Sequence, residues 1–229
     1  LDDITLSAWV NVSSLSFAGG GDAHLISKWH NATGKSFALA IQQSSAKAYF
    51  VIRSSGGGNI FTYTQSALDF DTWYHLTAMK DGNKIKIYLD GVLQEETTIS
   101  NAINSSSTGV GIGSSNTGTS GFFHGFIDEV QIWERAISLD KINEIILGPS
   151  LSNSLEGMIC YLRMERNSGL ELYDLSGNDH YGTASDVSQW SSNAIQFLPS
   201  VLLSTSKTIT NDQEVQVQVS FSTEVTGFS

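Results

Sequence analysis

Apolar and polar side chains alternate in short runs through the first 135 residues of the chain. Clear examples are residues 4–10 and 85–89, in which every second side chain is apolar, and in residues 37–41 large apolar side chains alternate with alanine. Each run is bounded by Gly, Asn, Asp or Ser, which favour turns. Because alternate side chains of a strand point to opposite faces, this period indicates strands with one buried face. The pattern predicts an all-β antiparallel sandwich.

Two turn signals frame one of these strands. Asp81-Gly82-Asn83 precedes residues 84–89, and Asp90-Gly91 follows them. Glycine adopts a positive φ without steric cost, and Asp and Asn tolerate it better than most residues. Residues 76–93 are therefore expected to form a three-stranded meander.

One short helix is expected at residues 139–147. Ser138 can cap its N-terminus, Asp140 and Glu144 place negative charge in its early turns, and Gly148 followed by proline ends it. The side chains spaced to form a buried stripe are Ile142, Ile145 and Ile146. The helix is too short to form a domain and is expected to pack against the sandwich.

The strand pattern starts again after the helix. Residues 158–162 and 194–197 are apolar strand candidates, and the polar segment 172–179 predicts a turn between them. Residues 214–221 alternate strictly, with Val215, Val217, Val219 and Phe221 on one face.

Composition narrows the classes of partner. The chain has 229 residues, with 23 acidic and 12 basic side chains and a formal net charge of −11. This charge disfavours nucleic acid and anionic membranes as partners, and no apolar run approaches the ~18 residues of a membrane-spanning helix. Cys160 is the single cysteine, so a disulfide within the chain is excluded, and its apolar surroundings favour a buried side chain. An extracellular or cell-surface location is expected.

Four motifs in one order resemble a known family. They are residues 4–10 (ITLSAWV), 73–77 (WYHLT), 87–91 (IYLDG) and 125–133 (GFIDEVQIW), the last followed by Arg135-Ala136-Ile137-Ser138. These residues resemble the laminin-G-like, concanavalin A-like jelly rolls, in particular those of bacterial multidomain proteins. The resemblance spans about 140 residues and implies a concanavalin A-like antiparallel β-sandwich.

The elements of this family occur here in an altered order. A strand and an Asp-x-Ser-Gly-Asn segment normally open the domain, whereas similar residues occur here after the helix, at 161–165 and 174–182. We divide the chain into residues 1–148 as the main jelly roll, 155–200 as the displaced opening segment, and 204–229 as an extra edge strand or the start of an immunoglobulin-like repeat. Residues 155–200 either close the same sandwich, begin a second repeat, or pair with another molecule by strand exchange. An unfinished sandwich would expose sheet edges, which favours closure.

The resemblance also implies a calcium site, since domains of this family often carry this ion. The candidate ligands are Asp128, Asp174 and Asn178, with Glu165 as a weaker one, because calcium prefers carboxylate and amide oxygens. The alternative is that Asp174 and Asn178 stabilise their own turn through bonds to the backbone, as Asx residues commonly do.

Sugar-binding sandwiches stack aromatic rings on sugars and hold hydroxyl groups with polar side chains. Trp29, Tyr49, Tyr63 and His124 are near the ends of predicted strands and are the candidate ligand-binding residues. For each of them alone, packing at the rim of the core is the competing interpretation.

Motifs for catalysis are missing from the sequence. Relatives that hydrolyse glucans carry Glu-x-Asp-x-x-Glu, which does not occur here, and Asp128 and Glu129 are expected on opposite faces of a strand. The five histidines lack the spacing of a zinc site. We therefore expect no enzyme but a recognition or adhesion module for a glycan or an extracellular protein, with a structural spacer as the alternative and a glycoside hydrolase as a third hypothesis.

Overall fold

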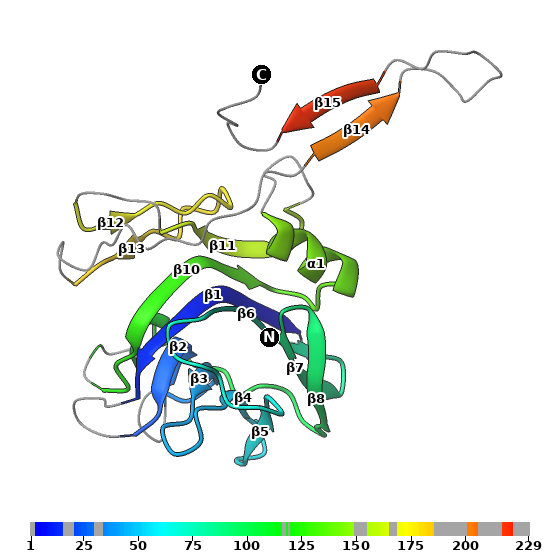
Figure 1. Ribbon diagram of the computed structural model, residues 1–229. Helices are drawn as coiled ribbons and strands as arrows, with labels where there is room; N and C mark the ends of the chain where they lie inside the picture. The colour runs from blue at the N-terminus through cyan, green and yellow to red at the C-terminus, as the bar shows by residue number, and fades with distance from the viewer. Residues whose placement is uncertain are drawn as a thin grey trace.

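The computed structural model describes residues 3–15, 21–29, 34–115, 118, 120–148, 155–164 and 169–185, and the backbone alone of residues 201–205 and 217–221. Two antiparallel sheets pack face to face in these residues (Figure 1). Among them, no helix is long and apolar enough to cross a membrane. The fold predicted from the alternating pattern is confirmed.

The larger sheet has six strands in the order β11-β10-β1-β6-β7-β8. Their bounds are Met158–Leu162 (β11), His124–Trp133 (β10), Ile4–Ser14 (β1), Trp73–Asp81 (β6), Lys84–Leu89 (β7) and Val92–Thr98 (β8). The strands β6, β7 and β8 pair consecutively, so the predicted meander is present.

The smaller sheet has five strands in the order β5-β4-β3-β2-β9. They are Asn59–Tyr63 (β5), Ala48–Arg53 (β4), Phe37–Ile41 (β3), Ala23–Lys28 (β2) and Gly111–Ile112 (β9). Strands β1 and β2, which follow each other in the sequence, lie in different sheets, and the two sheets form the two layers of a sandwich.

The core fills the space between the two sheets. In β1 the alternate residues Ile4, Leu6, Ala8, Val10 and Val12 are buried there, and they face residues such as Leu39 and Phe50 of the smaller sheet. Burying a side chain of this size stabilises a fold by about 1.5–3 kcal/mol. The alternation in the sequence therefore arises because every second side chain of a strand faces this core.

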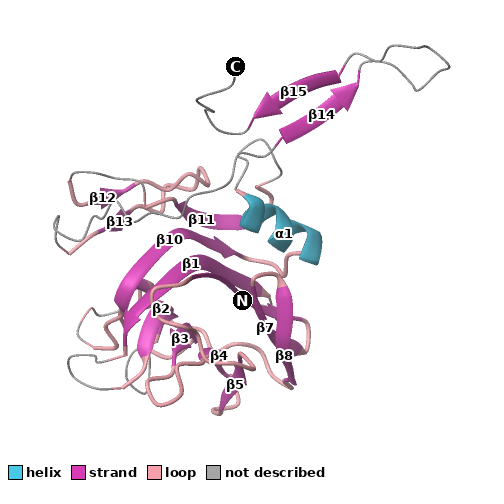
Figure 2. Cartoon of the chain, viewed as in Figure 1, coloured by secondary structure: helices cyan, strands magenta, loops and turns pink. Residues whose placement is uncertain are grey.

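Helix α1 spans Leu139–Leu147 and covers one end of the outer face of the six-stranded sheet (Figure 2). The Ser138 hydroxyl accepts the backbone N–H of Lys141, which satisfies one free donor of the first turn. Ile142 and Ile145 are buried and belong to one cluster with Trp133 and Met158. The predicted helix, its cap and its packing role agree with the structure.

Strand β11 pairs with β10 of the same chain. Val130 lies opposite Leu162, and Gln131 lies opposite Tyr161. Two further pairs of strands form small separate sheets: β12 (Glu171–Leu172) with β13 (Gly182–Thr183), and β14 (Val201–Thr205) with β15 (Val217–Phe221). The expected strand at 194–197 lies outside the described residues, and the division of the chain into domains stays a prediction.

Candidate functional site

Aromatic side chains gather on the outer face of the five-stranded sheet. Tyr49 of β4 lies opposite Tyr63 of β5, with ring centroids 5.7 Å apart, and Phe61 is 5.8 Å from Tyr49 and 6.0 Å from Tyr63. Trp29 packs against the same cluster from the end of β2. We call Trp29, Tyr49, Phe61 and Tyr63 the aromatic face.

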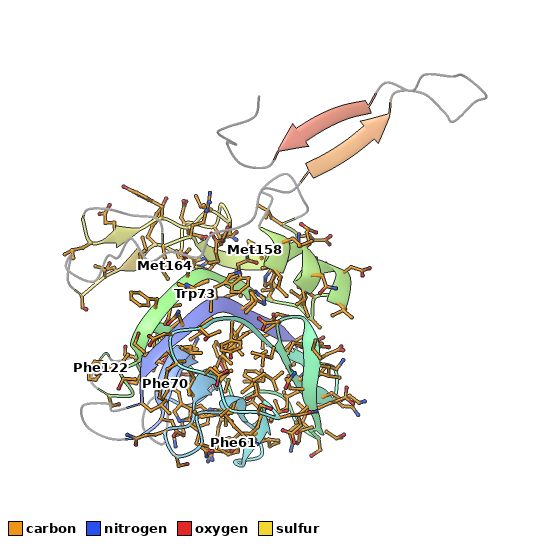
Figure 3. The ribbon with its side chains drawn as sticks, viewed as in Figure 1. Phe61, Phe70, Trp73, Phe122, Met158 and Met164 are labelled. Carbon is orange, nitrogen blue, oxygen red and sulfur yellow. The ribbon has the colours of Figure 1, made fainter. Side chains whose placement is uncertain are left out.

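Phe61 marks how open this face is. Its side chain is 38% exposed, although it is a large apolar group on a strand. Figure 3 shows it on the side of the sandwich opposite Met158, which lies on the other sheet. Single exposed apolar groups are common on protein surfaces, so the feature that distinguishes Phe61 is its contact with the rings of Tyr49 and Tyr63.

Two tyrosine hydroxyls at this face stay protonated at neutral pH. The Tyr49 hydroxyl donates to Asp22 over 3.0 Å, and burial, followed by the charge of Asp22, raises the pKa of Tyr49. Burial also raises the pKa of Tyr63, with smaller contributions from the carboxylates of Asp22 and Glu95. Both hydroxyl groups therefore keep a proton that can be donated in a hydrogen bond.

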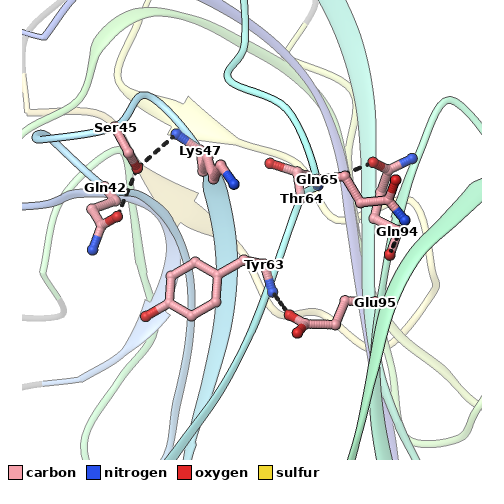
Figure 4. A pocket seen from close by; sticks show the side chains of 8 residues that line it. All are labelled: Gln42, Ser45, Lys47, Tyr63, Thr64, Gln65, Gln94 and Glu95. Carbon is pink, nitrogen blue, oxygen red and sulfur yellow. Dashed lines mark hydrogen bonds between the residues drawn. The ribbon is translucent and has the colours of Figure 1, made fainter.

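A polar pocket of about 640 Å³ adjoins the aromatic face and shares Tyr63 with it (Figure 4). This volume lies in the range of pockets that hold small ligands. Its lining is rich in amides and hydroxyls: Gln42, Ser45, Lys47, Tyr63, Thr64, Gln65, Gln94 and Glu95.

Hydrogen bonds hold the far wall of this pocket in place. Glu95 Oε2 accepts the backbone N–H of Tyr63 over 2.6 Å and the hydroxyl of Thr62 over 3.2 Å. Gln65 donates its backbone N–H to the Gln94 side chain and its Nε2 to the Gln94 carbonyl. Since these bonds join β8 of one sheet to the end of β5 of the other, the wall is fixed by both layers.

Three of the four predicted ligand-binding residues therefore meet at one place. Trp29, Tyr49 and Tyr63 belong to the aromatic face. His124 does not, because it begins β10 in the other sheet, opposite Ser14. As ligand contacts, all four stay a prediction.

Sequence reasoning missed the polar half of the site. Gln42 follows β3, Gln65 follows β5, and Gln94 and Glu95 lie within β8. Glutamine placed directly after a strand is a weak signal, and only the packing of the two sheets brings these residues together.

Asp174, a predicted calcium ligand, accepts hydrogen bonds with both carboxylate oxygens. Its Oδ1 accepts the backbone N–H groups of Tyr161 and Ser176 over 2.8 and 2.9 Å. Its Oδ2 accepts the N–H of His180 over 3.0 Å and the hydroxyl of Ser176 over 2.8 Å. Burial alone would raise the pKa of Asp174, but these bonds together lower it below its ordinary value.

Asn178 also forms hydrogen bonds to the backbone of β11, the strand that contains Tyr161. Its Nδ2 donates to the carbonyls of Met158 and Ile159 over 2.8 and 3.2 Å. The turn 174–180 thereby satisfies backbone groups on the outer edge of β11 with side chains. Free strand edges attract other strands, so this turn protects the edge of the larger sheet.

These contacts do not fit a calcium ion held by Asp128, Asp174 and Asn178. The oxygens of Asp174 already accept four donors, and Asp128 accepts the backbone N–H of Glu129 over 2.9 Å. Within the described ranges, no three His, Cys, Asp or Glu side chains form a group suited to a metal. Glu165 lies outside the described residues, and calcium stays a prediction.

One expectation about the carboxylates is wrong. Ser7 lies opposite Gln131 and Trp9 opposite Asp128, so Glu129 and Val130 together face Ala8, and Glu129 has a φ of 52°. This β-bulge turns both acidic side chains to the outer face. Asp128 shares that face with Trp9, and Glu129 accepts the Tyr161 hydroxyl there. Both carboxylates are buried, with 5% and 2% exposure, and this burial separates them from any sugar.

Comparison with known proteins agrees with this architecture. A structure of a candidate carbohydrate-binding protein from Bacteroides ovatus has a TM-score of 0.62 at 19% identity, covering 81% of this chain and 54% of its own. This chain thus spans about half the length of that protein. The carbohydrate-binding module CBM40 of the Ruminococcus gnavus IT-sialidase, bound to α2,3-sialyllactose, has a TM-score of 0.51 at 16% identity, covering 64% of this chain and 83% of the module.

A SAP-like pentraxin from Limulus polyphemus has a TM-score of 0.50 at 12% identity, covering 80% of this chain and 84% of its own. At such identities the likeness concerns the fold alone. No curated protein matches the chain. The family model of the concanavalin A-like lectin/glucanases superfamily matches residues 1–143, which is more than half of the sequence. The chain therefore belongs to the concanavalin A-like lectin/glucanase superfamily.

Proposed function

We propose that this chain is a non-catalytic module that binds a glycan at the aromatic face and the adjoining polar pocket. The observation that carries the proposal is the position of Tyr63, whose ring belongs to the aromatic face and also lines the amide-rich pocket. Sugar rings present apolar C–H faces beside polar hydroxyl groups. A site with an aromatic wall and several amides matches both kinds of surface.

The named relatives support the same class of ligand. The Bacteroides ovatus protein is a candidate for carbohydrate binding, and the structure of the Ruminococcus gnavus module has α2,3-sialyllactose bound. A module of this kind is expected to act outside the cell or at its surface, where polysaccharides and glycoproteins are accessible. A glycan carried by an extracellular protein would serve as the partner.

The proposal excludes hydrolysis at the two adjacent carboxylates of β10. Retaining and inverting glycosidases need two carboxyl groups that flank an accessible glycosidic bond. Asp128 and Glu129 are buried, and Glu129 is bonded to Tyr161 and to Arg163 at 3.4 Å. A sugar has no access to either group in this arrangement.

A glycan array followed by isothermal titration calorimetry tests the proposal. The wild-type protein should bind a defined set of glycans, and Tyr63→Ala should weaken this binding at least about tenfold, as expected for loss of a stacked ring and a hydroxyl donor. Tyr181→Ala is the matched control, since Tyr181 is an exposed tyrosine of the β12–β13 unit. A wild-type protein that binds no glycan would favour the spacer hypothesis, and reducing sugar released from a bound glycan would favour a hydrolase.

A further inference from the structure

Positive charge is concentrated in one part of this acidic chain. Residues 21–68, which form most of the five-stranded sheet, carry four of the 12 basic residues and only one of the 23 acidic residues. The four are Lys28, Lys35, Lys47 and Arg53, and the acidic residue is Asp22. On a protein of net charge −11, a region with an excess of basic residues is expected to attract anions.

The basic residues of the two sheets differ in their partners. In the six-stranded sheet, Lys80, Lys84 and Lys86 each pair with a carboxylate, namely Asp3, Glu96 and Asp81. In the part of the chain that the structure describes, no carboxylate lies at ion-pair distance from Lys35, Lys47 or Arg53. These three cations therefore remain available to an anion from outside.

All three cations border the proposed glycan site. Lys35 Nζ lies 5.1 Å from the centre of the Trp29 ring, and Lys47 lines the polar pocket beside Tyr63. Arg53 is the last residue of β4, and strand alternation places it on the same face as Tyr49 and Val51. Its Nη1 donates to Asn59 Oδ1 over 3.0 Å, which leaves the other guanidinium donors for a ligand.

The cations mark the two ends of one strand. Lys47 precedes β4 and Arg53 ends it, so six residues at about 3.3 Å each separate them by roughly 20 Å. The Arg53 N–H donates to the Ser36 carbonyl over 2.7 Å, and this bond brings Lys35 to the Arg53 end of β4. Tyr49 and Phe61 lie between these two positive ends.

The two carboxylates near the stretch from Lys47 to Arg53 accept hydrogen bonds from the protein itself. Asp22 accepts the Tyr49 hydroxyl and the backbone N–H of Gln43 over 3.1 Å. Glu95 accepts the N–H of Tyr63 and the hydroxyl of Thr62. Their charges are thus partly offset by internal donors, while the three cations have no such carboxylate partners.

We propose that the ligand is a linear anionic glycan, a chain of sugars that carries carboxylate or sulfate groups. It lies along β4, with one acidic group at Lys47 and another at Lys35 and Arg53, and its sugar rings contact the aromatic face between them. This inference rests on the proposed glycan-binding function and adds the charge and the extended shape of the ligand.

A glycan array with matched acidic and neutral oligosaccharides tests the inference, with separate members for uronates and for sulfated sugars. The bound glycans should be acidic, and titrations should show weaker binding at about 0.5 M than at about 0.05 M NaCl, because salt screens exposed charges. Lys47→Gln and Arg53→Gln should each weaken binding of the acidic glycan about tenfold, the scale of one charge-assisted hydrogen bond. Lys84→Gln is the control, since it makes the same change in net charge at an ion-paired lysine of the other sheet.

The possible results test the inference and the proposed function separately. Binding of uronates or of sulfated glycans that depends on Lys47 and Arg53 supports the inference and tells the two anions apart. Binding of neutral glycans that is unaffected by Lys47→Gln and Arg53→Gln overturns the inference and leaves the proposed function intact. A protein that binds no glycan on the array overturns the proposed function and the inference with it.

Discussion

The outer faces of the two sheets are opposite in character. On the six-stranded sheet the outer side chains are mostly polar, yet Ser7, Asn11, His75, Thr77 and Gln131 are all buried. On the five-stranded sheet the outer side chains include Tyr49, Phe61 and Tyr63, and the ring of Phe61 is open to solvent. Part of the first face is covered by α1 of the same chain, as Figure 2 shows.

The outer face of the six-stranded sheet concerns the stability of the fold, and that of the five-stranded sheet carries the proposed ligand site. Buried polar groups and exposed aromatic groups are the two deviations from ordinary burial that carry information. On the covered side, Tyr161 of β11 donates its N–H to Asp174 of the following turn and its hydroxyl to Glu129 of β10, and these bonds hold the strand in place. The open aromatic face is where we propose that a glycan binds.

The largest effect on stability is expected from Asp174→Ala. The substitution removes the acceptor of three backbone N–H groups, of Tyr161, Ser176 and His180, and should lower the free energy of unfolding by about 3 kcal/mol. Urea unfolding measures this change. Asp179→Asn, in the same turn but exposed, keeps a residue type that tolerates the φ of 59° at this position and should change it by less than about 0.5 kcal/mol. Equal unfolding midpoints for the two variants would contradict the role assigned to the turn.

The same variant should expose the edge of β11. Without Asp174 the turn no longer covers the backbone groups of that strand, and free edges pair with other chains. Light scattering after size-exclusion chromatography should show dimers or larger species for Asp174→Ala at a concentration where Asp179→Asn elutes as the wild type does.

The next largest expected effect is a change in the free energy of unfolding with pH, caused by His75. Burial lowers the pKa of this fully buried histidine to about 3, whereas an unfolded chain has a histidine pKa of about 6.5. Between these values the unfolded state binds the proton and the folded state does not. The stability contributed by neutral His75 is therefore complete above about pH 6.5 and falls as the pH is lowered toward 3, by at most about 1.4 kcal/mol per pH unit.

Urea unfolding between pH 7 and pH 4.5 would measure this slope, since Asp174, whose pKa is lowered, adds its own loss only below about pH 4. His75→Gln should reduce the slope and leave the part due to His24, whose pKa burial also lowers, whereas His124→Gln, at an exposed histidine, should retain the whole slope. A slope that is the same in both variants would show that His75 is accessible to protons in the folded state.

A smaller effect is expected from Tyr161→Phe. The variant removes the hydroxyl that donates to the buried Glu129, and loss of a hydrogen bond to a charged group should cost about 2 kcal/mol. Tyr181→Phe removes a hydroxyl bonded to the exposed Asp179 and should leave the unfolding midpoint where it is in the wild type. Denaturant unfolding of both variants compares a covered contact with an exposed one.

The smallest effect is expected from calcium. Because the oxygens of Asp174 already accept four donors, millimolar calcium should shift the Tm by less than about 1 °C relative to a chelator. A rise of several degrees, lost in Asp174→Asn, would show that the turn rearranges around the ion and would restore the predicted ligand set.

Local patterns predicted most of the fold. The period of two in β1 and β7 and the capped helix after Ser138 depend on neighbours in the sequence, and both appear where expected. The bulge at Glu129 could not be predicted, because it arises from the register between β1 and β10. The expectation for Asp128 and Glu129 failed for this reason.

The candidate site was predictable only in part. Aromatic residues near strand ends pointed to Trp29, Tyr49 and Tyr63, but nothing in the sequence shows that β4 and β5 place the two tyrosines side by side. The polar pocket needs Gln65 and Gln94, whose contact joins the two layers. Residues that meet only through long-range packing leave no local signal.

Backbone amide chemical-shift mapping tests the central claim most directly, since it compares both outer faces in one experiment. The labelled protein would be titrated with a glycan selected on the array. The account predicts shifts concentrated at residues 42–65, which contain β4 and β5, and at Gln94 and Glu95 of β8. Shifts concentrated in β10, β11 and the turn 174–180, with the aromatic face unaffected, would contradict it.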